Sequence, residues 1–451
     1  MYHGFFIKLL PCILICFFTA CNTGRIRKDT LGSHIDVSDA NTCESTDGTH
    51  GSTGCFDLAI NEQSMASALD ETALFETAQV LSSDELRGRG NRGRSSAKKA
   101  RAIIINRLQS CGIQPVTDAG YEQTVSGTKC INVIGRVPGK DPALQNQHIM
   151  LSAHYNPVGS CKGQICKTGS HNASAVAAVM EISCAAAKHP AKRPLLVALW
   201  DCEEPPRGNT KKKGSEYFAA HPTVSLENIS ASIVLDRFGS EMWPGFNGLF
   251  VLGTESSDVL RSVVDRLEPE EGLNVYSFGL HAVEQTMFGH TSLSDYNAFR
   301  DRQIPIIFVS DDTNKTSRRR TDSWDQISQD KLLFETRYVF DMTRNIMNSE
   351  EAPTWQGHPH LGKHELESVI EVSKIALGKT DTPAVAETIE LSPISTFHLE
   401  SDFKRLKKIR SRLDRSGGGL TKSDIVSIRK GTQRLMCLTG SDYQENFCWL
   451  L

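Results

Sequence analysis

Four short segments of the chain each carry side chains of the kind that bind a metal ion or move a proton. They are 152–156 with His154 and Asn156, 169–174 with His171, 199–204 with Glu203 and Glu204, and 234–239 with Asp236. Imidazole nitrogens and carboxylate oxygens are ligands that Zn²⁺ prefers in proteins, and a carboxylate beside an activated water can accept its proton. A single such segment is more often structural, but four in one chain indicate a shared site.

Each segment stands at the end of a short apolar run that is typical of a buried strand, or in the loop after it. The strand candidates are 132–137, 148–153, 195–200, 232–235, 249–252 and 304–309, and the helix candidates between and after them are 172–187, 256–266 and 329–346. This alternation predicts an α/β fold with a mixed, mainly parallel sheet and helices on both faces. Since ligands bind at the carboxyl ends of such strands, we expect the four segments to converge.

The composition excludes several classes of protein. Hydrophobic residues make up 39% of the 451 positions, which is enough for a large core and excludes disorder throughout, while the 23% of charged residues is ordinary for a soluble domain. Fifty Lys and Arg against 53 Asp and Glu leave a formal net charge of −3. This balance gives the whole chain no attraction to polyanions, so we expect no nucleic-acid partner.

The first 21 residues are typical of an export signal. Lys8 precedes an apolar run over 9–18 that is too short to span a bilayer, and Thr19-Ala20-Cys21 follows it. These residues resemble a bacterial lipoprotein box, which predicts an exported lipoprotein, anchored to a membrane of the bacterial cell envelope by a lipid on Cys21. An ordinary signal peptide and a plain membrane anchor are the alternatives. Residues 22–70 are rich in Ser, Thr, Asp, Asn and Gly and predict a flexible polar tether.

Ten cysteines follow Cys21, an even number that favours disulfides in an exported chain. Their positions suggest pairs of near neighbours, although spacing alone leaves the connectivity open. The pairs predicted on this basis are Cys43–Cys55, Cys111–Cys130, Cys161–Cys166, Cys184–Cys202 and Cys437–Cys448. Zinc ligation is the alternative for Cys161 and Cys166, but no second pair of Cys or His accompanies them.

Five further motifs make the interpretation more specific. They are LSSDELRGR over 81–89, NVIGRVPG over 132–139, GSEYF over 214–218, SDYNAF over 294–299 and TDSWDQI over 321–327. With the four segments above, they resemble the M28 metallopeptidases, a family of zinc aminopeptidase-like proteins, from about residue 71 to residue 348. The resemblance implies a zinc aminopeptidase-like fold for a domain over 71–349, with peptide hydrolysis as its activity.

The resemblance also implies roles for individual residues. Members of the family hold two zinc ions with five ligands, and a Glu next to one ligand accepts a proton from the bridging water. His154, Glu204 and Asp236 match ligand positions, and Glu203 matches the base. Asn156 stands two residues after His154, where the family has an Asp. The resemblance implies that the Asn156 side chain contacts the metal ligands without being a ligand itself.

Two ligand positions of the family carry different residues in this chain. His171 replaces the Asp that bridges the two ions, and Arg318 replaces the last His. A neutral imidazole offers one lone pair and cannot bridge two cations, while a protonated guanidinium cannot ligate and repels a divalent ion. We therefore expect one zinc per chain, held by His154, His171 and Asp236 with an open position for water, and Arg318 paired with Glu204.

Residues 350–451 differ in character from the domain before them. Between 402 and 434, eleven Lys or Arg stand against three Asp, on either side of a glycine break at 417–419. The pattern predicts a helical, basic C-terminal extension. Contact with an anionic surface is one interpretation of this charge, and a solvated helical face is the other.

Three functions agree with these residues. The leading hypothesis is an exported, membrane-tethered metallopeptidase that hydrolyses a peptide or protein substrate in the manner of an aminopeptidase, with a single zinc. The first alternative is a catalytically inactive scaffold of the same fold that binds peptides or a protein partner. The second is acyl transfer of the glutaminyl-cyclase kind, again with one zinc. Zinc content separates the two enzymes from the inactive scaffold, because a fold by itself does not establish activity.

Overall fold

The computed structural model describes most of the chain after residue 67. The described residues are 68–89, 94–156, 160–161, 164–204, 207, 210–286, 289–290, 294–311, 321–357, 360–380 and 391–439. Several predictions fall outside them: the export signal with Cys21, nearly all of the tether, and Arg318. The predicted pair Cys43–Cys55 also lies outside the described residues, as does Cys448 of the predicted pair Cys437–Cys448.

The fold is built on a nine-stranded mixed sheet. Its strands are β1 (Gln114–Pro115), β2 (Glu122–Thr124), β3 (Ile131–Val137), β4 (His148–His154), β7 (Leu195–Trp200), β8 (Ile229–Asp236), β9 (Gly248–Leu252), β10 (Asn274–Phe278) and β13 (Ile306–Ser310). The order is β1-β3-β7-β4-β8-β13-β9-β10, with β2 paired to β3. The four central strands β7, β4, β8 and β13 are mutually parallel, whereas β3 and β9 join them antiparallel. The predicted fold class is confirmed. Two small hairpins, β5–β6 (Ser160–Cys161, Gln164–Ile165) and β11–β12 (Gln285–Thr286, Gly289–His290), lie apart from the sheet.

Apolar cores cover both faces of this sheet, which explains why its central strands are apolar without a break. Along β7, Leu195, Val197 and Leu199 enter one core, while Leu196 and Trp200 enter the other, because successive side chains of a strand point to opposite faces. Every residue of β4 and β7 is buried. A parallel sheet needs this burial, since helices pack on both of its sides.

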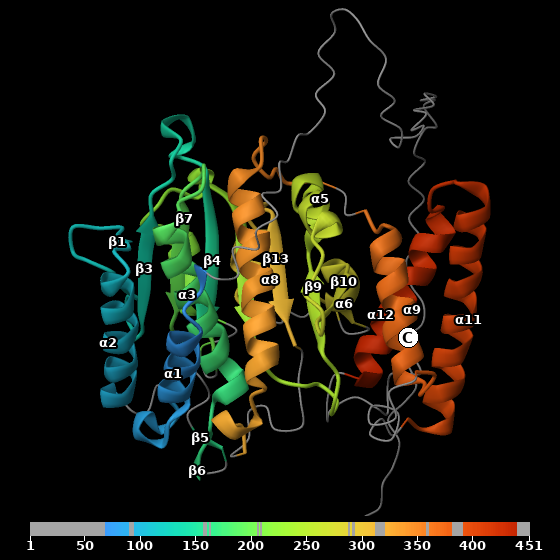
Figure 1. The fold of residues 1–451 in the computed structure, drawn as a ribbon, viewed down its shortest axis with the longest axis horizontal. Helices are drawn as coiled ribbons and strands as arrows, with labels where there is room; N and C mark the ends of the chain where they lie inside the picture. The colour runs from blue at the N-terminus through green and yellow to red at the C-terminus, as the bar shows by residue number, and fades with distance from the viewer. Residues whose placement is uncertain are drawn as a thin grey trace, which may run out of the picture. The chain divides into compact units, whose positions relative to one another are not determined.

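Helices divide between the two faces of the sheet. The first core is shared with α1 (Glu71–Ser82), α2 (Arg94–Ser110), α3 (Ser174–Lys188), α5 (Asp258–Arg266) and α8 (Gln329–Asn348). Figure 1 shows α3 and α8 in front of the sheet. The second core is shared with α4 (Gly214–Ala220), α6 (Leu280–Glu284), α7 (Asn297–Arg300) and the C-terminal helices. Alanine and other small residues let α3 pack closely, and its residues are buried from Ser174 to Ala186.

The C-terminal extension is helical, as predicted. It consists of α9 (Lys363–Ala376), α11 (Pro393–Ser416) and α12 (Lys422–Thr439), and α9 packs against β10 at the edge of the sheet (Figure 1). The Ser277 N–H of β10 donates to Ser368 Oγ of α9 at 2.9 Å. Gly417 ends α11 with a positive φ of 61°, the backbone conformation that glycine adopts at helix ends. Among the described residues, no helix combines the length and the apolar character that crossing a bilayer requires.

The disulfides differ from the predicted pairs. Cys111 pairs with Cys184 and Cys130 pairs with Cys202, so the pairs Cys111–Cys130 and Cys184–Cys202 were wrong. The reason is topological: α2 packs on α3, and β3 runs antiparallel to β7, so that the start of β3 meets the end of β7. Near neighbours in sequence are therefore not neighbours in the fold. Cys166 is disulfide-bonded as well.

Candidate metal site at the carboxyl ends of the central strands

The four segments converge at one edge of the sheet, because the central strands are parallel and end there together. His154 is the last residue of β4 and Asp236 is the last residue of β8. Glu203 and Glu204 follow β7, and His171 lies in the irregular turn Gly169–Ala173 before α3. All five side chains are buried.

Two imidazoles and one carboxylate form a compact group of ligand atoms. His154, His171 and Asp236 each offer an atom within 4.8 Å of the other two. His154 Nε2 lies 3.4 Å from Asp236 Oδ1, and His171 Nε2 lies 3.7 Å from the same oxygen. Two nitrogens and one oxygen that converge in this way are a donor set that suits a single zinc with one position left open.

The residues around the group orient its ligand atoms. His154 Nδ1 lies 3.0 Å from the backbone oxygen of Asn156, so Nδ1 donates there and Nε2 is directed toward Asp236. Ser294 Oγ donates to Asp236 Oδ2 at 3.0 Å, which leaves Oδ1 on the side of the imidazoles. Asn172 accepts the Arg237 N–H at 2.9 Å through its side-chain oxygen and thereby holds the chain after β8.

The electrostatics of the group favour a cation. Burial disfavours the charged form of His154, but the carboxylates of Glu203 and Asp236 outweigh burial and raise the pKa of His154 to about 9. Burial likewise opposes the ionised form of Asp236, yet Arg237 and His154 hold the pKa of Asp236 well below its usual range. Without a metal, a proton on His154 therefore supplies the positive charge that the carboxylates need.

Glu203 stands beside the ligands rather than among them. Its backbone N–H donates to Asn156 Oδ1 at 2.9 Å, and its Oε2 lies 3.9 Å from His154 Nε2. This buried oxygen has no hydrogen-bond partner among the described residues. A buried carboxylate oxygen is costly when unsatisfied, so Oε2 fits a position that receives a proton or a donor from a molecule in the site.

Glu204 lies beside His171 at the candidate metal site. Its Oε1 lies 3.2 Å from His171 Nε2, so Glu204 belongs to the same cluster as the two imidazoles. The predicted partner Arg318 lies outside the described residues. Glu204 can therefore ligate a metal or receive a hydrogen bond from His171.

The motif at 321–327 holds the turn that carries His171. The carboxylate of Asp322 accepts the N–H of His171 at 3.2 Å, and it accepts both the N–H and the hydroxyl of Ser170 at 2.8 Å. Burial raises the pKa of Asp322 to about 6, although these hydrogen bonds oppose the rise. Arg89, buried nearby, donates to Thr168 at the start of the turn.

A buried ion-pair cluster supports the loop after β8. Lys331 Nζ lies 2.8 Å from Asp311 Oδ1 and 3.2 Å from Glu335 Oε1. The same two carboxylates accept the N–H of Ser240 at 2.7 Å and of Gly239 at 2.8 Å. Burial and the neighbouring Asp311 carboxylate raise the pKa of Glu335 well above its usual range.

Sequence reasoning missed Lys213. This residue stands in the run of three lysines at 211–213, which reads as solvated charge, yet its side chain is buried. Its Nζ donates to the Ser294 backbone oxygen at 2.8 Å and lies 3.5 Å from Asp295 and 3.9 Å from Glu203 Oε1. The one sequence signal for it was its position directly before the GSEYF motif.

Comparisons with known proteins agree with this geometry. The fold and the buried His and carboxylate cluster define a metallohydrolase-like α/β domain. Residues 132–341, somewhat less than half of the chain, match the model of peptidase family M28. No curated protein sequence matches the chain. This match supports a hydrolase-type enzyme and zinc as its metal in general terms.

Two solved structures illustrate the fold. The LapA aminopeptidase of Legionella pneumophila is 13% identical with a TM-score of 0.51, and the match covers 67% of this chain and 79% of LapA. The glutaminyl cyclase of Macrostomum lignano is 16% identical with a TM-score of 0.50, and the match covers 66% of this chain and 95% of the cyclase. At such low identities, these likenesses show a common fold and nothing finer.

Proposed function

We propose that the chain is a peptide hydrolase of the aminopeptidase type that works with a single zinc ion. His154, His171 and Asp236 would hold the ion, and Glu203 would act as the base. The observation that carries this proposal is the pairing of a compact two-imidazole, one-carboxylate cluster with a neighbouring buried carboxylate oxygen that has no hydrogen-bond partner among the described residues. These are the ligand set and the proton acceptor that a one-zinc hydrolase needs.

The same residues argue against a pair of zinc ions. A bridging carboxylate supplies two oxygens, whereas His171 Nε2 supplies one nitrogen, and that nitrogen already lies near both Glu204 and Asp236. Zinc at this site would supply Lewis-acid activation of a water and of the substrate carbonyl. Glu203 would take a proton at Oε2 and return it to the leaving amine, while Asn156 keeps the Glu203 backbone in place.

The roles of the two neighbouring carboxylates can be separated by matched substitutions. Glu203→Gln should abolish turnover and leave zinc bound, because Glu203 moves a proton and does not ligate. Glu204→Gln, one residue away and also buried, is the control and should weaken zinc binding first. The measurements are zinc content by elemental analysis and turnover of a panel of aminoacyl reporter substrates. Loss of zinc from Glu203→Gln with retention in Glu204→Gln would mean that the two roles are exchanged.

Wild-type protein in the same experiment tests the alternatives. About one zinc per chain is expected, whereas two tightly held ions would refute the single-site proposal. Zinc without turnover of any substrate would favour the inactive scaffold that binds peptides or a protein partner. Turnover of peptides with an N-terminal glutamine, but not of aminoacyl reporters, would favour acyl transfer of the glutaminyl-cyclase kind.

We also propose that a lipid on Cys21 anchors the protein to a membrane of the bacterial cell envelope. The apolar run over 9–18 and the small residues before Cys21 support this proposal. Acyl chains would supply the membrane affinity, at about 0.8 kcal/mol per buried methylene. The segment over 22–70 would then hold the hydrolase at a distance from the membrane surface.

A further inference from the structure

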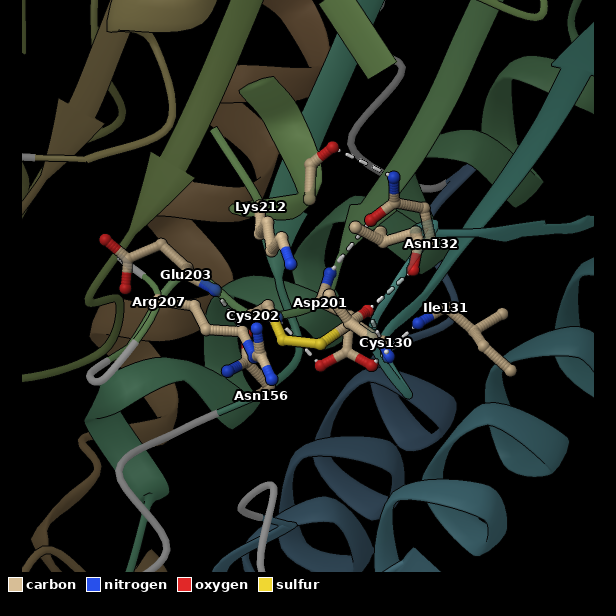
Figure 2. The surroundings of a disulfide bond; sticks show 12 residues. Cys130, Ile131, Asn132, Asn156, Asp201, Cys202, Glu203, Arg207 and Lys212 are labelled. Atoms are coloured by element: carbon tan, nitrogen blue, oxygen red, sulfur yellow. Dashed lines mark hydrogen bonds between the residues drawn. A yellow bond between two sulfur atoms is a disulfide. The ribbon is translucent and has the colours of Figure 1, made fainter. Parts of the chain in front are cut away.

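The Cys130–Cys202 disulfide adjoins the residues that the proposed function uses (Figure 2). Cys202 directly precedes Glu203 and Glu204, and Cys130 directly precedes β3. Both cysteines are buried, and they pack against Val125 in a small apolar cluster of their own. The disulfide therefore joins the segment that carries the carboxylates to a strand of the central sheet.

The backbone at Cys202 adopts a conformation that needs support. Its φ is +60°, in the left-handed region that residues with a side chain seldom occupy. The chain leaves β7 at this point and turns to bring Glu203 next to His154. A conformation of this kind persists only when the surrounding contacts determine it, so the contacts of this turn decide where Glu203 lies.

Hydrogen bonds link the same two segments as the disulfide does. The Asp201 carboxylate accepts the Cys202 N–H at 2.8 Å and the Ile131 N–H at 2.9 Å, and the Asp201 N–H donates to Asn132 Oδ1 at 3.1 Å. Figure 2 shows Asp201, Ile131 and Asn132 grouped beside the sulfur atoms. The covalent bond is thus one part of a clamp between the start of β3 and the end of β7.

The far end of the loop returns to the same clamp. The Gly214 N–H donates to the Asp201 backbone oxygen at 2.9 Å, and Asn132 Nδ2 donates to the Gly214 oxygen at 3.0 Å. A Cβ at Gly214 would lie 2.4 Å from the Asp201 oxygen, so only glycine permits this approach. Both ends of the loop between Asp201 and Gly214 are therefore fixed at one place.

We propose that the Cys130–Cys202 disulfide positions Glu203. The bond holds the turn at Cys202 in its left-handed conformation and so keeps the Glu203 carboxylate aligned beside His154. The role of Glu203 as a base rests on the proposed function. The effect of the disulfide on the backbone turn at Cys202 does not depend on that function. Cys130 and Cys202 are positioning residues in this assignment, since neither touches the ligand group.

The second disulfide provides an internal control. Cys111–Cys184 spans 73 residues of sequence and Cys130–Cys202 spans 72, so the two bonds close loops of nearly equal length. Loop closure then predicts nearly equal effects on stability. Cys184 lies ten residues after Ser174, the first residue of α3, about 15 Å along the helix from the turn that carries His171. Its removal should leave the site intact.

The experiment compares Cys130→Ala/Cys202→Ala with Cys111→Ala/Cys184→Ala. Hydrogen exchange is followed by mass spectrometry in a peptide that contains Cys202 and Glu203, whose N–H donates to Asn156. Zinc content and turnover of the aminoacyl reporters are measured in parallel. We expect at least tenfold faster exchange at Glu203 and a fall in kcat of about 100-fold only in the first variant, with a smaller change in KM. Both variants should lose thermal stability to a similar extent.

Equal exchange and equal turnover in the two variants would overturn the proposal, because the bond would then contribute stability alone. Wild-type protein that turns over no substrate would count against the proposed function, while the exchange data would still decide whether the bond fixes the turn. If the double variant does not fold, Cys130→Ala alone removes the covalent link and leaves Cys202 packed against Val125. Unchanged exchange in that variant would likewise refute the assignment.

Discussion

Zinc binding should release a proton from His154 at neutral pH. His154 Nε2 lies 3.4 Å from Asp236 Oδ1 and 3.9 Å from Glu203 Oε2, and these carboxylates, against the effect of burial, raise the pKa of His154 to about 9. At pH 7 only about 1% of metal-free molecules would then have the neutral imidazole that a metal requires. The apparent zinc affinity at pH 7 should therefore be about 100-fold weaker than the affinity for the neutral imidazole. Removing the proton two units below its pKa costs roughly 2.7 kcal/mol of the free energy of binding, since one pKa unit corresponds to about 1.4 kcal/mol.

Calorimetric titration with zinc tests this value. Measurements at pH 7 in two buffers with different ionisation enthalpies give the number of protons released, and His154 should contribute close to one. The affinity should increase about tenfold per pH unit between pH 6 and 8 through this residue. Glu203→Gln is the control, because it removes a charge that raises the pKa of His154 without removing a ligand, and it should flatten the pH dependence. An affinity that does not change between pH 6 and 8 would refute the reasoning.

Three further predictions concern stability and location. The metal-free protein should lose stability as the pH rises from about 6.5 through 9, because His154 binds its proton more tightly in the folded protein than in the unfolded chain. Thermal melts in the presence of a chelator measure this loss of stability. Lys331→Met should lower the free energy of unfolding by about 3–5 kcal/mol in urea titrations, since it leaves Asp311 and Glu335 buried without their cation. A change below about 1 kcal/mol would show that the cluster is not needed. Cys21→Ser should move the protein from the membrane fraction to the soluble exported fraction. If the variant stays bound, a wash with high salt identifies the cause: salt releases a protein held by charge contact of the basic extension, but not one held by an uncleaved anchor.

The sequence predicted the central sheet because its strands are short apolar runs that alternate with helical patterns. The run over 195–200 coincides with β7, and the predicted helix over 172–187 lies within two residues of α3. The strand β10 was missed because its five residues are partly exposed and their pattern is short. The convergence of His154 and Asp236 could be predicted because both residues end parallel strands.

Features that depend on tertiary neighbours could not be predicted. The pairing of Cys130 with Cys202 requires the antiparallel arrangement of β3 and β7, which no spacing of cysteines encodes. Lys213 reads as surface charge until the carboxylate of Asp295 and the Ser294 oxygen are known to surround it. The contact between Glu204 and His171 similarly arises from two loops whose paths the sequence leaves open.

The place of α9 beside β10 affects how the domain could be produced as a fragment. An edge strand presents unpaired backbone N–H and C=O groups that can add a strand from a second molecule, and such pairing leads to aggregation. Here the Ser368 hydroxyl accepts the Ser277 N–H, and the helix that carries Ser368 covers that edge. A fragment that ends at residue 349 retains every ligand of the candidate site but exposes this edge. Such a fragment should associate through β10, whereas a chain that extends through α9 should stay dispersed.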